Sequence, residues 1–171
     1  MSVIQQETPV TDTSPKYQIR LPADVAAAME ALAKAAGYET SAYIQMVLTR
    51  HVLDSGMLPD ETATRLAARE SVIARFIALA QKLKADGRFD AHFQRTVFME
   101  AMNDEDLRAL YETAVGGDAF TDGLPGKTPL NMYLGWYIKN AVGAEVQMKD
   151  GKPARASVRN APIQSYTLLQ E

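Results

Sequence analysis

The segment over residues 16–52 constrains the fold of this chain more than any other. Its first six residues alternate in character, which is typical of a strand with one buried face. The apolar members of this alternation are Tyr17, Ile19 and Leu21. Pro22 ends the predicted strand, and two helical patterns follow, over residues 23–36 and from 40 to about 52.

Local signals separate the two predicted helices. Gly37 stands where a helix C-terminus needs a residue that tolerates a positive φ, and Thr40 or Ser41 is expected to cap the second helix. One strand and two helices in under forty residues cannot bury a core alone, because the strand edge and one apolar helical face stay open. The simplest solution is a symmetric dimer in which two strands pair antiparallel.

The polar face of the predicted strand would then lie beside its twofold copy. Its members are Lys16, Gln18 and Arg20. An antiparallel two-stranded ribbon fits the major groove of double-stranded DNA. Gln pairs with adenine and Arg or Lys with guanine, so these side chains are candidates for reading bases.

The order of signals over residues 16–53 resembles the ribbon-helix-helix (Arc/MetJ/CopG-like) DNA-binding domain. The resemblance is carried by the alternating K-Y-Q-I-R-L-P stretch, the Ala-rich first helix, Gly37 and the T-S-A-Y-I start of the second helix. It covers under a quarter of the chain. It implies an intertwined homodimer joined by its N-terminal strands, with Lys16, Gln18 and Arg20 reading bases. The backbone amides of Thr40 and Ser41 would contact DNA phosphate.

The charge of this region departs from the basic footprint of most DNA-binding modules. Residues 1–56 hold four basic and six acidic side chains. Any positive field must therefore be local, and we expect modest non-specific affinity with a shallow salt dependence.

The rest of the chain predicts a flexible arm over residues 1–15 and a helical C-terminal domain over residues 60–171, beyond the DNA-binding domain at 16–54. Helices are expected over 61–86, 90–102, 104–115 and 129–142. A small sheet should follow, with strands at 145–148, 154–159 and 163–169 and a hairpin turn at 149–152. The predicted fold class is thus mainly α, an N-terminal ribbon-helix-helix followed by a helical domain with a terminal β-hairpin.

The predicted hairpin is basic. Lys149, Lys152, Arg155 and Arg159 are candidates for a second, winged-helix-like DNA contact. The same surface suits a higher oligomer or a protein partner equally well.

Several kinds of chemistry find no support in the sequence. The chain has no Cys and two His, so neither a metal site nor a cofactor is expected. The Gly126-Lys127-Thr128 sequence lacks the Gly that a phosphate-binding loop requires at position 121. No catalytic set stands out, and no apolar run is long enough to span a membrane. A cytoplasmic protein without enzymatic activity is expected, and an effector pocket around Trp136 stays open.

These observations predict a dimeric, sequence-specific DNA-binding protein, with transcriptional repression as the leading role. The S-A-Y-I-Q start of the second helix is similar to that of some conjugative relaxosome accessory proteins, so plasmid partition or transfer is an alternative. An antitoxin-type protein-interaction module is a further alternative.

Overall fold

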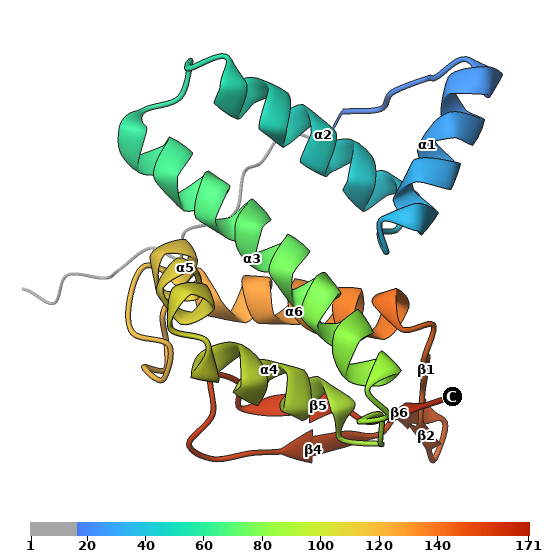
Figure 1. The fold of residues 1–171 in the computed structure, drawn as a ribbon, viewed down its shortest axis with the longest axis vertical. Coiled ribbons are helices and arrows are strands. Elements are labelled where there is room, and N and C mark those ends of the chain that lie inside the picture. The colour runs from blue at the N-terminus through green and yellow to red at the C-terminus, as the bar shows by residue number, and fades with distance from the viewer. Residues whose placement is uncertain (1–16) are drawn as a thin grey trace, which may run out of the picture.

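The computed structural model describes residues 17–171, and Figure 1 shows helices followed by short strands at the C-terminus. The helices are α1 (Ala23–Ala35), α2 (Thr40–Asp54), α3 (Asp60–Ala85), α4 (Phe93–Asn103), α5 (Glu105–Val115) and α6 (Lys127–Ala141). The strands are β1 (Glu145–Val146), β2 (Met148–Lys149), β3 (Lys152–Pro153), β4 (Arg155–Ser157), β5 (Ser165–Thr167) and β6 (Leu169–Gln170).

The structure corrects the expected N-terminal ribbon. Residues 17–22 are irregular and the first regular element is α1, so the predicted fold class, with an N-terminal ribbon ahead of the helices, is wrong. A strand is held by hydrogen bonds to a neighbouring edge, and every strand pair among residues 17–171 lies in the C-terminal part. Lys16 and the predicted flexible arm over residues 1–15 lie outside the described residues.

The connection between α1 and α2 rests on the body of the molecule. Gly37 has φ 76°, and a Cβ built there would lie 3.1 Å from a side-chain carbon of Ile77 in α3. The next residue, Tyr38, packs edge-on against Tyr137 of α6, with ring centroids 5.2 Å apart. The α1–α2 hairpin is therefore anchored at its turn.

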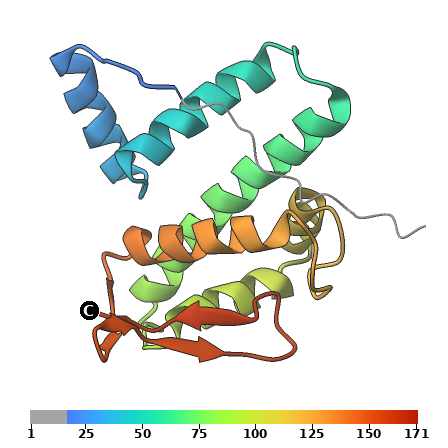
Figure 2. The ribbon, with the colours of Figure 1, turned by 180° about the vertical axis from the view of Figure 1, so that it is seen from behind.

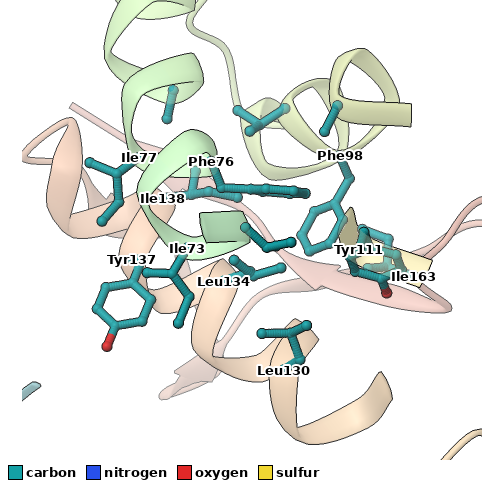
Figure 3. Packing of buried hydrophobic residues seen from close by; sticks show 14 of the residues in the cluster. Ile73, Phe76, Ile77, Phe98, Tyr111, Leu130, Leu134, Tyr137, Ile138 and Ile163 are labelled. Atoms are coloured by element: carbon teal, nitrogen blue, oxygen red, sulfur yellow. The ribbon is translucent and has the colours of Figure 1, made fainter. Parts of the chain in front are cut away.

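The core lies between α3 and the three helices α4, α5 and α6. Figure 3 shows Ile73, Phe76 and Ile77 of α3 facing the apolar side of α6. Phe98 of α4 and Tyr111 of α5 complete this cluster; the ring of Phe98 packs edge-on against Phe76, with centroids 5.1 Å apart. The regular spacing of apolar residues along α3 thus determines which face of this helix is buried.

The acidic residues at the start of α5 have a structural role. The side chain of Asp104 accepts a hydrogen bond from the amide of Leu107, 2.9 Å away, and forms an ion pair with Arg75. That amide hydrogen bond is the main reason why the pKa of Asp104 is lowered. The acidic cluster is a helix cap, with no need of a catalytic role.

The C-terminal strands form three antiparallel pairs, β1 with β6, β2 with β3, and β4 with β5. Positive φ values at Asp150 and Gly151, 52° and 76°, make the β2–β3 turn a tight hairpin of the kind the sequence suggests. Figure 2 shows β4 and β5 running below α4, with α6 above that helix. Within residues 17–171, no helix combines the length and apolar character needed to cross a membrane.

Candidate nucleic-acid interface

The predicted base-reading segment is an exposed coil that leads into α1 (Figure 1). Gln18 and Arg20 are both exposed, and Lys16 lies outside the described residues. The apolar residues between them are exposed as well, Tyr17 by 84% and Ile19 by 54%. Two of the three predicted side chains are thus accessible to a ligand, and their apolar neighbours are without a covering surface.

The α1–α2 hairpin carries an apolar surface with no partner among the described residues. The helix α1 buries only Ala33, and α2 buries no residue at all. We call hairpin face the set of exposed apolar side chains on these two helices, namely Val25, Leu32, Leu48 and Val52. Where such side chains form one contiguous patch, the patch marks an interaction site in a soluble protein.

The predicted phosphate anchor at the start of α2 is already occupied. The carboxylate of Glu39 accepts hydrogen bonds from the amides of Ser41, at 2.9 Å, and Ala42, at 3.2 Å. The hydroxyl of Ser41 donates to the same carboxylate, and this bond, followed by those from the amides, lowers the pKa of Glu39. A DNA phosphate at Thr40 and Ser41 would have to displace this negatively charged cap.

The predicted basic hairpin residues lie at three places. Lys149 and Lys152 face each other across the β2–β3 pair at its exposed tip. Arg155 lies in β4, where its guanidinium donates to the hydroxyl of Ser165, 2.8 Å away. Arg159 is exposed beyond the end of β4. The four side chains therefore lie at three different places along the C-terminal strands.

A second feature, which the sequence did not reveal, is the joint between the α1–α2 connection and the rest of the fold. At this joint Tyr38 contacts Tyr137 of α6 and lies near Glu70 of α3. Tyr38 has a pKa raised to about 12, first by burial and then by the nearby carboxylate of Glu70. Burial also raises the pKa of Glu70 and of Tyr137. The only local signal for this joint is the aromatic residue directly after Gly37.

No metal site emerges from these residues. Within the described range, no group of three His, Asp or Glu side chains could hold a metal ion. The imidazole of His92 shares a hydrogen bond with the hydroxyl of Tyr166, 2.8 Å away, at the edge of the core.

Comparison with known proteins returns no match. No protein family, no curated protein and no solved structure is significantly similar to the chain.

Proposed function

We propose that this chain is a dimeric DNA-binding protein that contacts bases with Gln18 and Arg20. The observation that carries the proposal is the unpartnered hairpin face, because four exposed apolar side chains on two adjacent helices need a covering surface. A second copy of the chain supplies such a surface by symmetry. The resemblance of residues 16–53 to a DNA-binding family is the reason for choosing DNA as the ligand.

The proposed contacts follow from the chemistry of the two side chains. Gln binds adenine and Arg binds guanine, each through two hydrogen bonds in the major groove. Each good pair contributes about 1–3 kcal/mol of discrimination against a wrong base. A twofold dimer presents this set of two side chains twice and so favours an inverted repeat.

Transcriptional repression is the role we propose first, and an accessory role in plasmid partition or conjugative transfer is the alternative. Either role would place the protein in the cytoplasm. An antitoxin-type module remains a second candidate, because the hairpin face would suit a different protein chain as well as a second copy. A toxin that co-purifies with the chain would favour that candidate.

The proposal is tested by measuring how the purified protein binds DNA fragments that flank its own gene. We expect the Gln18→Ala/Arg20→Ala variant to lose roughly tenfold or more in affinity for the selected fragment. Its affinity for unrelated DNA should change far less. Fluorescence anisotropy at fixed salt measures both affinities.

A matched control removes the same charge elsewhere. Arg95 is exposed on α4, and Arg95→Ala should leave the selective affinity unchanged. Selectivity retained by the double variant would contradict the proposed role of these two residues. Circular dichroism should show that the variant keeps the wild-type fold, because both side chains are exposed.

A further inference from the structure

A cavity of about 490 Å³ lies beside the only tryptophan of the chain. Its lining residues belong to α4, to the loop before α6, to α6 itself and to the strands β4 and β5. Figure 2 shows how these elements are arranged. Sites that bind small organic molecules usually measure about 300–1,000 Å³, so the cavity has the size of a ligand site.

The floor of the cavity is pre-formed. The amide of Gln94 donates to the carbonyl of Gly135, 2.9 Å away, and accepts from the amide of Thr167 at 3.1 Å. Asn131 accepts from the hydroxyl of Tyr111, at 2.7 Å, and donates to the carbonyl of Pro162 at 3.0 Å. These bonds join α4, α5, α6 and the C-terminal strands, so the cavity does not depend on a ligand to take shape.

The ionisable side chains that line the cavity leave an excess of positive charge. Lys127 is buried, donates to the carbonyl of Thr121 and lies 3.7 Å from the carboxylate of Asp122, so this pair is close to neutral. Lys139 and Arg155 form no ion pair with any carboxylate in the described part of the chain. An anionic group would therefore be attracted to these two side chains.

The apolar part of the lining indicates what else the ligand carries. Trp136 is half-buried at the wall, and Met132, one turn earlier on α6, is 72% exposed. Gly135 lies between them without a side chain, and a Cβ there would lie 3.3 Å from the amide oxygen of Gln94. Indole and thioether groups offer favourable contacts to a flat ring.

We propose that this cavity binds a small aromatic anion, a ring that bears a carboxylate or a phosphate. The ring packs against Trp136, and the anionic group is bound by Lys139 and Arg155. This site is separate from the proposed DNA contacts at Gln18 and Arg20, so the inference does not depend on DNA binding.

The experiment uses three probes that share one ring: benzoate, phenyl phosphate and the neutral benzamide. The indole N–H of Trp136 gives a single NMR signal, because the chain has one tryptophan. We expect benzoate or phenyl phosphate to shift this signal to saturation, and the probe that binds more tightly identifies the anion. Benzamide should bind about tenfold more weakly or worse, because it carries no negative charge to pair with the two cations.

Variants test the assignment of the two cations. Lys139→Gln/Arg155→Gln should weaken binding of the better anion about tenfold or more. The control Lys149→Gln/Lys152→Gln removes two positive charges from the exposed hairpin tip and should bind as the wild type does. Three results would overturn the proposal: no saturable shift with either anion, benzamide binding as tightly as both anions, or unchanged binding by the Lys139/Arg155 variant in a folded protein.

Discussion

Gly37 combines a left-handed backbone conformation with a close contact to α3, so its replacement affects two interactions at once. Its φ is 76°, and an added Cβ would lie 3.1 Å from Ile77 and 3.3 Å from Gln81. We expect Gly37→Ala to lower the free energy of unfolding by more than the roughly 1–2 kcal/mol of backbone strain alone. Chemical denaturation measures this loss.

Gly87 provides the matched control. Its φ is 72°, but no atom lies within 4 Å of an added Cβ. Gly87→Ala should therefore cost only the backbone strain, and the difference between the two variants reports how tightly the hairpin turn packs on α3. Equal losses would show that this packing contributes nothing to stability.

Glu39 caps α2, whereas the sequence predicted Thr40 or Ser41 as the cap. Thr and Ser are the commoner capping residues, and Glu39 directly precedes them. We expect Glu39→Ala to lower the free energy of unfolding by about 1 kcal/mol at neutral pH, as for other lost caps. The pKa of Glu39 is lowered in the folded protein. Its stabilisation is thus present above the unfolded-state pKa and is lost as the pH falls through the folded-state value.

Unfolding curves of the wild type and of Glu39→Ala at neutral and acidic pH test this direction of the pH dependence. The difference between the two proteins should shrink in acid. Glu39→Gln separates charge from hydrogen bonding, because the amide oxygen still accepts from Ser41. A Glu39→Ala variant as stable as the wild type at neutral pH would show that this cap does not stabilise the fold.

At the scale of elements, the helices were predictable and the ribbon was not, for a physical reason. The spacing of apolar residues along α3 is a local feature of the sequence. So are Gly87 and Gly116, which follow the ends of α3 and α5. The alternation over residues 16–21 is local too, but a strand exists only where another edge pairs with it. Within residues 17–171 the paired strands all lie between 145 and 170, so residues 17–22 have no partner edge in their own chain.

The candidate cavity was still harder to predict, because its parts are distant in sequence. Gln94 contributes its floor, Trp136 its wall and Arg155 its charge. The sequence drew attention to Trp136 and Arg155 separately, for an effector pocket and for a basic hairpin. Only the packing of β4 and β5 under α4 brings them to one site (Figure 2).

The contact of Tyr38 with Tyr137 of α6 should make the fold sensitive to alkaline pH. The pKa of Tyr38 is about 12 in the folded protein against 10.0 for a free tyrosine. Its stabilising effect is therefore complete below about pH 10 and is lost as the pH rises toward 12. We expect Tyr38→Phe to lose less stability than the wild type between pH 9 and pH 11, measured by chemical denaturation. Equal losses would exclude Tyr38 as a source of this pH dependence.

At the scale of the whole molecule, the proposed dimer depends on the hairpin face. Leu32 is 53% exposed on α1 and Leu48 is 48% exposed on α2. We expect Leu32→Ser/Leu48→Ser to shift the protein from dimer to monomer in analytical ultracentrifugation, because the covered apolar area is lost. Met57, 82% exposed outside these helices, is the control, and Met57→Ser should stay dimeric. A wild type that sediments as a monomer at every concentration would contradict the dimer.

The helix α3 runs unbroken for 26 residues, about 39 Å, and packs against α2, α4, α5 and α6. The α1–α2 hairpin and the remainder of the fold both pack on this one rigid helix. Two copies joined at their hairpins would place their bulkier halves on opposite sides of the contact. Small-angle X-ray scattering would record an elongated, two-lobed particle, with a radius of gyration above that of a sphere of equal mass.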